Sequence, residues 1–368
     1  MNRVIYRSSF FFLFWFFGFT NLYAQQALEI KGLCIALPQP EFLDDFIDFA
    51  AKELKPSGIN TLVLRVDYRY QYESRPELRG ENPMSKAQVK KLVDACEDLG
   101  IEIIPQLNLL GHQSWHSKAT KLLEVYPEFD ETPNIKLPDT YEWPNEDGLY
   151  CKSYCPQHPN VHDVVFDLVD EIVEVFKAKA FHAGMDEVFY LAHKDCQRCN
   201  GYDPAKLFAN EVLKINNHLA KKDIRLWIWG DRLIDGAETG IGMWEASMNN
   251  TARAIDIIPK SVVICDWHYE KAYPTPAYFA TKGFNVVACP WRKPNVAKEQ
   301  VEMITDFKSN SNKKMASRYL GVMHTYWSSA EKFMKEYKNP AHKIDEKGYS
   351  SVLTFKAMAN SIKELGEK

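Results

Sequence analysis

Two carboxyl residues stand side by side at the end of a short apolar segment. Asp186 and Glu187 follow residues 178–181, which read as a buried strand, and an amphipathic helical pattern over residues 161–176 precedes that strand. Adjacent strand residues point to opposite faces, so both acids can serve one pocket only if the strand ends there. Gly184 indicates such an end. The pair could be active-site acids, a solvated loop or part of a divalent metal site.

Strand-like and helix-like segments alternate along the chain. The expected strands are residues 28–37, 60–67, 101–107, 178–181, 224–229, 261–266, 285–289 and 320–325, and the expected helices are residues 42–54, 85–99, 161–176, 204–220, 296–307, 328–337 and 350–365. This alternation predicts an α/β fold, a single-domain (β/α)8 TIM barrel with a long loop insertion, residues 113–159, after the third strand. A doubly wound open sheet is the alternative, but no glycine-rich phosphate loop follows any expected strand.

The residues near the carboxyl ends of the expected strands are the candidates for the site, because those ends face the active site of a parallel barrel. They are Asp67, His112, His182, Asp186, Glu187, Trp229, Asp231, Trp267, Trp291 and Trp327. The four tryptophans either cap the barrel core or offer flat apolar faces to sugar rings, whose hydroxyls carboxylates can bind. No metal-binding spacing accompanies the acids, so we predict neither a metal nor a cofactor in the site.

Composition and the N-terminal segment bear on partners and location. The net charge of −4 over 368 residues gives no reason to expect nucleic acid or an anionic membrane surface as a partner. Residues 1–24 have the pattern of a signal peptide, because Arg3 and Arg7 precede a ten-residue apolar run and Ala24 ends a possible processing site. We expect export to the periplasm or the cell exterior, with residues 25–368 as the catalytic domain. A membrane anchor is the alternative, but a spanning helix needs about 20 apolar residues.

Eight cysteines in an exported chain invite a disulfide interpretation. Four of them lie in apolar runs and are expected to be buried, inert thiols: Cys34, Cys96, Cys265 and Cys289. The other four pair by spacing, Cys151 with Cys155 and Cys196 with Cys199. They could form two disulfides or a four-thiolate zinc site, and the expected compartment favours disulfides.

Several stretches resemble motifs of one enzyme family. Residues 182–187 (His-Ala-Gly-Met-Asp-Glu) resemble the His-x-Gly-Gly-Asp-Glu signature of glycoside hydrolase family 20, the β-N-acetylhexosaminidases. Residues 104–112 are similar to the family's Ile-Pro-Glu-x-Asp-x-Pro-Gly-His stretch, residues 60–67 to its second-strand segment, and residues 229–231 to its Trp-Asp-Glu turn. The resemblance covers roughly residues 28–335, and the signature around the acid pair is its most specific part.

The resemblance implies exo-acting, retaining hydrolysis of terminal β-linked N-acetylhexosamine from an oligosaccharide or glycoconjugate. Asp186 would hold the substrate's 2-acetamido group while its carbonyl oxygen attacks the anomeric carbon. Glu187 would protonate the glycosidic oxygen and later act as base on water. Asp67 and His112 would support Glu187 as a polar chain, and the tryptophans would wall the acetamido pocket. The adjacency of the acids suits this chemistry, because one negative charge raises the pKa of its neighbour.

The chain departs from the family pattern at several positions. Met185 replaces the second glycine of the signature, Lys31 stands about where the family has a sugar-binding arginine, and Ser329 replaces a glutamate. No Tyr-x-Asp follows the seventh expected strand, and we expect no separate N-terminal domain. Two alternatives therefore stay open beside the hexosaminidase: a glycosidase of this barrel type for another sugar, and a non-catalytic carbohydrate-binding relative. Retention of both acids argues against the second, while linkage, gluco or galacto preference and oligomeric state stay open.

Overall fold

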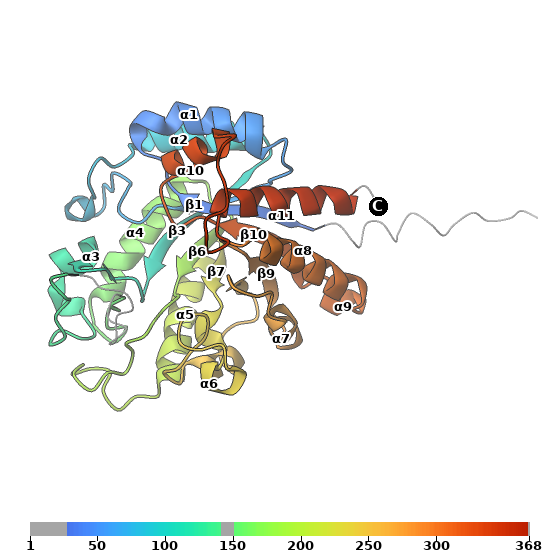
Figure 1. Ribbon diagram of the computed structural model, residues 1–368. Helices are drawn as coiled ribbons and strands as arrows, with labels where there is room; N and C mark the ends of the chain where they lie inside the picture. The colour runs from blue at the N-terminus through green and yellow to red at the C-terminus, as the bar shows by residue number, and fades with distance from the viewer. Residues whose placement is uncertain (1–27, 141–150, 367–368) are drawn as a thin grey trace, which may run out of the picture.

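The eight long strands close into one parallel barrel (Figure 1). A computed structural model of the chain describes residues 28–140 and 151–366, so the expected signal peptide lies outside the described residues. Around the barrel the strands follow the order β1-β10-β9-β8-β7-β6-β3-β2, and β1 pairs in parallel with both β10 and β2. The predicted (β/α)8 barrel is confirmed, and its closure excludes the open doubly wound sheet.

The elements have the following bounds. The barrel strands are β1 (Ile30–Ala36), β2 (Thr61–Arg65), β3 (Glu102–Leu109), β6 (Ala180–Gly184), β7 (Arg225–Trp229), β8 (Val263–Trp267), β9 (Asn285–Cys289) and β10 (Tyr319–Thr325), and β4 (Ser114–Trp115) pairs with β5 (Lys118–Ala119) as a small hairpin. The helices are α1 (Leu43–Phe49), α2 (Lys86–Asp98), α3 (Lys121–Val125), α4 (Val161–Val175), α5 (Pro204–Ala220), α6 (Gly236–Thr239), α7 (Thr275–Thr281), α8 (Pro294–Ser309), α9 (Lys313–Ala316), α10 (Ala330–Lys338) and α11 (Ser351–Gly366).

The structure differs from the expected elements mainly in the connections. The expected helix over residues 42–54 is a short α1 followed by a π-helical turn, Ala50–Leu54. Helix α7, between β8 and β9, was not expected, because its seven residues are too few to show a helical period. The described part of the insertion after β3 holds the β4–β5 hairpin and α3, and residues 141–150 of it lie outside the described residues.

Local sequence signals explain where the main helices begin. Ser85 caps α2 by accepting a hydrogen bond from the backbone N–H of Gln88, whose side chain returns a bond to Ser85. Asp203 caps α5 in a similar way, and Pro204 occupies the first helical position, where no N–H is needed. Helix α4 buries its apolar side chains at spacings of three and four residues, so one face of it covers the barrel.

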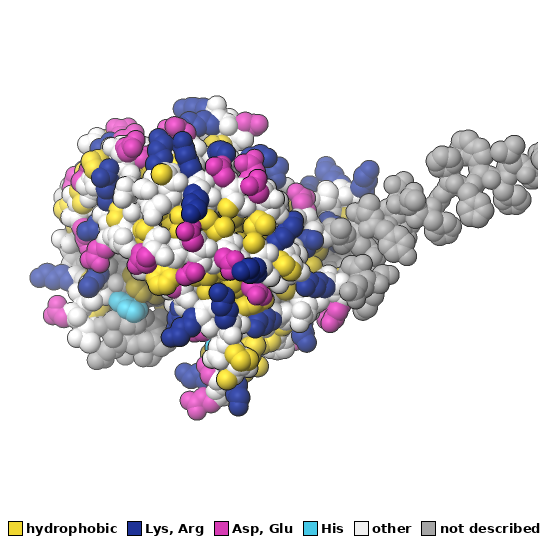
Figure 2. Space-filling view, turned by 90° about the horizontal axis from the view of Figure 1, so that it is seen from above, with side chains coloured by type: hydrophobic (Ala, Val, Ile, Leu, Met, Phe, Trp, Pro, Cys, Tyr) yellow, Lys and Arg dark blue, Asp and Glu magenta, His cyan; other side chains and the backbone are white. Residues whose placement is uncertain are grey.

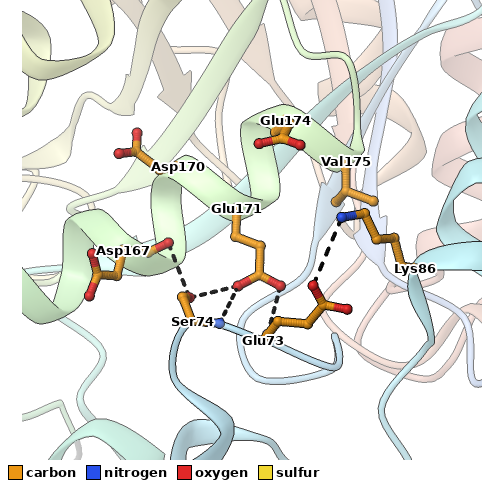
Figure 3. Close-up of a pocket in the computed structure, with 8 residues that line it drawn as sticks. All are labelled: Glu73, Ser74, Lys86, Asp167, Asp170, Glu171, Glu174 and Val175. Atoms are coloured by element: carbon orange, nitrogen blue, oxygen red, sulfur yellow. Dashed lines mark hydrogen bonds and ion pairs between the residues drawn. The ribbon is translucent and has the colours of Figure 1, made fainter.

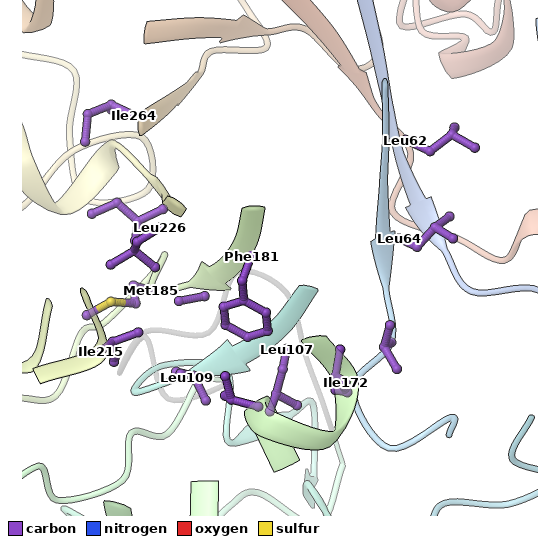
Figure 4. Close-up of a cluster of buried hydrophobic side chains, with 14 of the residues drawn as sticks. Leu62, Leu64, Leu107, Leu109, Ile172, Phe181, Met185, Ile215, Leu226 and Ile264 are labelled. Atoms are coloured by element: carbon purple, nitrogen blue, oxygen red, sulfur yellow. The ribbon is translucent and has the colours of Figure 1, made fainter. Parts of the chain in front are cut away.

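Two layers of apolar side chains hold the barrel together. The inner layer fills the barrel and includes Cys34, Val63, Ile104, Trp227, Trp229, Val263, Cys265, Val287, Cys289 and Met323. The outer layer packs between strands and helices, and Figure 4 shows the part of it around Phe181, Leu107 and Ile172. Both faces of each strand are therefore buried, which explains why the strands read as almost continuous apolar runs.

The loop that follows β2 is fastened to helix α4 (Figure 3). The Glu171 carboxylate accepts hydrogen bonds from the backbone N–H groups of Glu73, at 2.7 Å, and Ser74, at 2.9 Å. Arg75 adds a bond from its Nε to Asp167 at 2.8 Å. The residues Glu73, Ser74, Asp167 and Glu171 also line a shallow hollow of about 320 Å³. The carboxylates of Asp167 and Glu171 in this hollow are thus occupied in binding the loop after β2.

The surface carries charges of both signs. In Figure 2, Lys and Arg side chains are interspersed with Asp and Glu side chains over the face shown, in keeping with the small net charge of −4. Among residues 28–140 and 151–366, no helix is both long and apolar enough to cross a membrane.

Candidate active site

A pocket of about 920 Å³ opens at the carboxyl ends of the barrel strands. It lies where a parallel barrel places its catalytic groups, and its size suits a sugar ligand. The lining includes seven of the ten residues predicted from the sequence: Asp67, His112, Asp186, Glu187, Trp267, Trp291 and Trp327. The three others, His182, Trp229 and Asp231, are buried and are not among the lining residues.

The backbone after β6 brings both acids to this one pocket. Gly184, Met185 and Glu187 all have positive φ angles, of 68°, 68° and 49°, so the strand alternation stops at Gly184. A Cβ atom on Gly184 would lie 2.4 Å from Oδ1 of Asn108, and the position therefore requires glycine. The expectation that the strand ends before the acids agrees with this geometry.

Met185 occupies the left-handed conformation that the family signature fills with glycine. A side chain in that conformation costs about 1–2 kcal/mol. Met185 is 1% exposed and packs in the outer apolar layer (Figure 4), and full burial of such a side chain contributes about 1.5–3 kcal/mol. Burial is therefore large enough to offset the backbone strain, and the turn keeps its shape without the second glycine.

His112 bridges the two acids. Its Nε2 lies 3.0 Å from Oδ2 of Asp186 and 3.4 Å from Oε2 of Glu187. Burial alone would lower the pKa of His112, but the charge and hydrogen bond of Asp186 hold that pKa well above its usual value. Burial raises the pKa of Asp186, but the charge and hydrogen bond of His112, together with smaller contributions from the backbone and His182, bring the Asp186 pKa below its usual value. At neutral pH the site therefore holds an imidazolium–carboxylate pair.

One oxygen of Asp186 is left for a ligand. Its Oδ2 is engaged by His112, whereas Oδ1 is buried and has no hydrogen-bond donor within the described part of the chain. A buried carboxylate oxygen without a donor is unfavourable, and Asp186 is a lining residue of the pocket. A ligand N–H placed in the pocket would satisfy it.

His182, Trp229 and Asp231, the predicted residues that do not line the pocket, are buried beneath it. Asp231 accepts a hydrogen bond from the backbone N–H of Glu187 at 2.9 Å, and Nε of Arg232 lies 2.6 Å from the same oxygen. Trp229 is fully buried in the inner layer, with its ring centroid 4.5 Å from that of His182. Within the described structure, Asp231 supports the acid-bearing loop and Trp229 packs against His182, while a sugar contact of His182, Trp229 and Asp231 stays a prediction.

Aromatic rings form one wall of the pocket. The ring centroids of Trp267 and Tyr269 lie 4.8 Å apart, and those of Tyr269 and Trp291 lie 5.1 Å apart. The indole N–H of Trp327 donates to the Tyr269 hydroxyl at 2.8 Å, which links the ends of β8 and β10. The wall continues the inner apolar layer upward, so the indoles both cap the core and face the pocket.

Asp67 lies on the β3 side of the pocket. It lines the pocket, and its Oδ1 accepts a hydrogen bond from the backbone N–H of Asn108 at 3.0 Å. The polar contacts that the structure shows for the His112 ring are with Asp186, Glu187 and Cys151, and the ring also lies beside that of Trp115. Asp67 thus holds the β3 end of the site.

Arg65 was missed by the sequence reasoning, which looked to Lys31 for the sugar-binding cation. Lys31 is the second residue of β1, far from its carboxyl end, whereas Arg65 ends β2 and lines the pocket. Its guanidinium lies 5.0 Å from the Trp327 ring centroid, and its Nε is buried without an acceptor among the described residues. Its position at the carboxyl end of a predicted strand was the available signal.

Cys151 was also missed as a neighbour of the acids. Its sulfur lies 3.4 Å from Nδ1 of His112 and 3.4 Å from Oε2 of Glu187, and it is fully buried. Burial is the main reason that its pKa is raised to about 12, so the group is a neutral thiol that donates to Glu187. The expected pairing of Cys151 with Cys155 is contradicted, because Cys155 instead contacts Cys196 and Cys199.

The acid pair, the histidine bridge and the aromatic wall at the mouth of a (β/α)8 barrel are typical of a glycoside hydrolase. Residues 64–344 match the family model described as "Glycosyl hydrolase family 20, catalytic domain". This match covers more than half of the chain, so the chain belongs to glycoside hydrolase family 20, as the sequence motifs predicted.

Two curated proteins illustrate the relationship. The chain is 23% identical over 216 residues to a lacto-N-biosidase of Bifidobacterium bifidum, a match that covers 56% of this chain and 18% of that protein. It is 28% identical over 120 residues to a β-hexosaminidase of Akkermansia muciniphila, covering 32% of this chain and 22% of that protein. The matched regions thus span less than a quarter of each relative's length.

Solved structures share the fold. The Flavobacterium johnsoniae chitobiase aligns with a TM-score of 0.60 at 15% identity, covering 92% of this chain and 52% of that chain. An exo β-N-acetylglucosaminidase from Vibrio harveyi aligns with a TM-score of 0.60 at 15% identity, covering 90% and 54%. At such identities the likeness concerns the barrel fold.

Proposed function

We propose that this protein is an exo-acting, retaining β-N-acetylhexosaminidase that uses the 2-acetamido group of its substrate as the nucleophile. The proposal rests on Asp186, a lining residue of the pocket whose buried Oδ1 has no donor among the described residues. An acetamido N–H supplies the donor that this oxygen lacks. Membership of family 20 and the match to a β-hexosaminidase support this choice of sugar.

Asp186 acts on the acetamido group in two ways. Its negative charge, stabilised by His112, orients the N–H and stabilises the positive charge that develops as the carbonyl oxygen closes onto the anomeric carbon. The Tyr269 hydroxyl accepts the Trp327 indole N–H, which leaves its own proton to donate to that carbonyl oxygen. The result is a cyclised intermediate in which no enzyme carboxylate is bonded to the sugar.

Glu187 is the general acid and base. It protonates the glycosidic oxygen as the bond breaks, and afterwards takes a proton from the water that opens the cyclised intermediate. Its backbone N–H is fixed by Asp231, and its carboxylate is contacted by His112 and by the Cys151 thiol. These contacts hold the side chain at the pocket wall through both steps.

A second candidate function is the release of a disaccharide. The lacto-N-biosidase match covers 56% of this chain, and a pocket of about 920 Å³ lies near the upper end of the range usual for ligand sites. Such a substrate also carries a 2-acetamido group, so Asp186 and Glu187 keep the same roles.

A matched set of aryl glycosides tests the proposed function. We expect rapid cleavage of aryl β-N-acetylglucosaminide or β-N-acetylgalactosaminide, and almost no cleavage of aryl β-glucoside or β-galactoside, because the last two lack the internal nucleophile. Aryl β-lacto-N-bioside distinguishes the second candidate. Faster turnover of a plain glucoside than of every acetamido substrate would contradict both.

Export is a further proposal. It rests on the pattern of residues 1–24, with cleavage expected near Ala24.

A further inference from the structure

Three cysteines and one glutamate meet in a buried cluster outside the active-site pocket. Cys155 lies in the insertion after β3, Cys196 and Cys199 lie in the loop after β6, and Glu131 follows a short 3-10 helix in the insertion. The Cys155 sulfur is 3.3 Å from that of Cys199 and 3.5 Å from that of Cys196. The three sulfurs and one carboxylate oxygen all lie within 4.8 Å of one another.

Glu131 is buried beside the three cysteines without a cationic partner among the described residues. Its side chain is 0% exposed, and one oxygen accepts a hydrogen bond from the backbone N–H of His193 at 3.2 Å. The other oxygen, Oε2, accepts no hydrogen bond from the described residues, and none of their Lys, Arg or His side chains forms an ion pair with it. The nearby ammonium of Lys152 is paired with Asp130 instead. A buried carboxyl group either takes up a proton or keeps its charge through an ion pair or a metal, and a metal would be the cation that this site lacks.

The sulfurs come from two segments that meet at one point. Cys196 and Cys199 lie in a single loop, and the Cys155 sulfur reaches both of them from the insertion after β3. The Cys-x-x-Cys spacing of Cys196 and Cys199 is the one found in structural zinc sites.

We propose that Glu131, Cys155, Cys196 and Cys199 bind one structural zinc ion. Three thiolates and one carboxylate give the closed four-ligand set typical of such sites, and soft sulfur ligands favour zinc over magnesium or calcium. Zinc–sulfur bonds of about 2.3 Å in a tetrahedron place sulfurs about 3.8 Å apart. The sulfurs, at 3.3 and 3.5 Å, need to move by only a few tenths of an ångström.

A disulfide explains the cluster less well. The expected pair of Cys196 with Cys199 leaves Cys155 as a free thiol, and any pairing of three cysteines leaves one unpaired. In every case Oε2 of Glu131 stays buried with no cation. Zinc uses all four groups, and it ties the insertion to the loop that follows Glu187, so it fixes two segments that frame the active site.

Metal content and thiol oxidation of the full mature chain, purified without a metal-binding tag, test the proposal. We expect about one zinc per chain by elemental analysis, and an intact mass without the loss of two hydrogens that a disulfide produces. Exchange into cobalt should give the visible absorption bands of a tetrahedral thiolate site. A metal-free protein that takes up neither added zinc nor cobalt, or one with a disulfide among these cysteines, would overturn the proposal.

Variants locate the ion. Glu131→Gln should weaken zinc binding by at least about tenfold in a chelator competition, since an amide is a poorer ligand, and Cys199→Ser should abolish the cobalt bands. Cys151→Ser is the matched control, because Cys151 is equally buried but lies with His112 and Glu187 in a separate cluster. The Cys151→Ser variant should keep its zinc.

The opposite result would refute the assignment. Zinc lost in Cys151→Ser and retained in both Glu131→Gln and Cys199→Ser would place the ion in the active site. Because metal content is measured directly, this result is independent of the proposed hydrolase activity.

Discussion

Glu187→Gln is expected to lower kcat on natural disaccharides by about 10²–10⁴-fold, the range that general acid–base catalysis supplies. The amide cannot protonate the glycosidic oxygen, and a natural sugar leaving group needs that proton. Substrates with strongly activated aryl leaving groups should lose far less in the first step. Stopped-flow or steady-state rates on both kinds of substrate would separate the two effects.

The swap is nearly isosteric, so the fold should survive it. The carboxylate of Glu187 is contacted by His112 and Cys151, and its backbone bond to Asp231 is unaffected by the change. Glu97→Gln, on an exposed side chain of α2, is the control and should keep the wild-type rate. Wild-type turnover of a natural disaccharide by Glu187→Gln would remove Glu187 from the role of general acid.

Asp186→Asn is expected to reduce turnover of acetamido substrates by about 10²–10³-fold, as when a group aimed at transition-state charge is removed. The neutral amide presents no charge to the developing positive charge. It also no longer raises the pKa of His112, which should fall toward its ordinary value. Rates on an acetamido substrate and NMR titration of the His112 ring measure the two consequences separately.

The discrimination between substrates is the sharper measure of Asp186. In the variant, the ratio of rates on acetamido and plain glycosides should collapse, since the main role of the residue is to hold the acetamido group, and the effect through His112 falls on both substrates. Asp94→Asn, an exposed acid paired with Lys177, is the control and should leave that ratio unchanged. A variant of Asp186 that kept the wild-type ratio would show that the acetamido group is held elsewhere.

Much of the fold was predictable because its signals are local. Strand β9 has the predicted bounds, Asn285–Cys289, and helix α5 begins at Pro204 after its Asp203 cap, as its sequence indicates. Both depend on neighbours within a few residues. Helix α7 and the β4–β5 hairpin were not predicted, because their few residues carry no period and their conformation depends on packing against the rest of the barrel.

The sequence predicted which residues lie at the strand ends, but not the direction in which each side chain points, and that direction decides whether it can contact a ligand. The position of Trp229 at the end of β7 did not reveal that its ring points into the barrel, whereas Trp267 ends β8 and lines the pocket. Arg65 lies at the end of β2, but the family pattern drew attention to Lys31 on the preceding strand.

Contacts between distant segments were beyond the sequence. The pairing of cysteines by spacing placed Cys151 with Cys155, yet Cys151 meets Glu187 and Cys155 meets Cys199, which is 44 residues away. Glu131 carries no motif that would mark it as a fourth ligand. Such groupings follow from how two long loops fold over one another, and no local propensity encodes that.

Inhibition by a thiazoline mimic of the cyclised intermediate tests the central claim most directly. If the acetamido oxygen is the nucleophile, the mimic resembles a high-energy state, and its inhibition constant should lie at least about 10²-fold below the KM of the matching N-acetylhexosaminide. No inhibition by the thiazoline, together with rapid hydrolysis of a plain β-glucoside, would contradict the account. It would point to Asp186 or another carboxylate as a direct nucleophile.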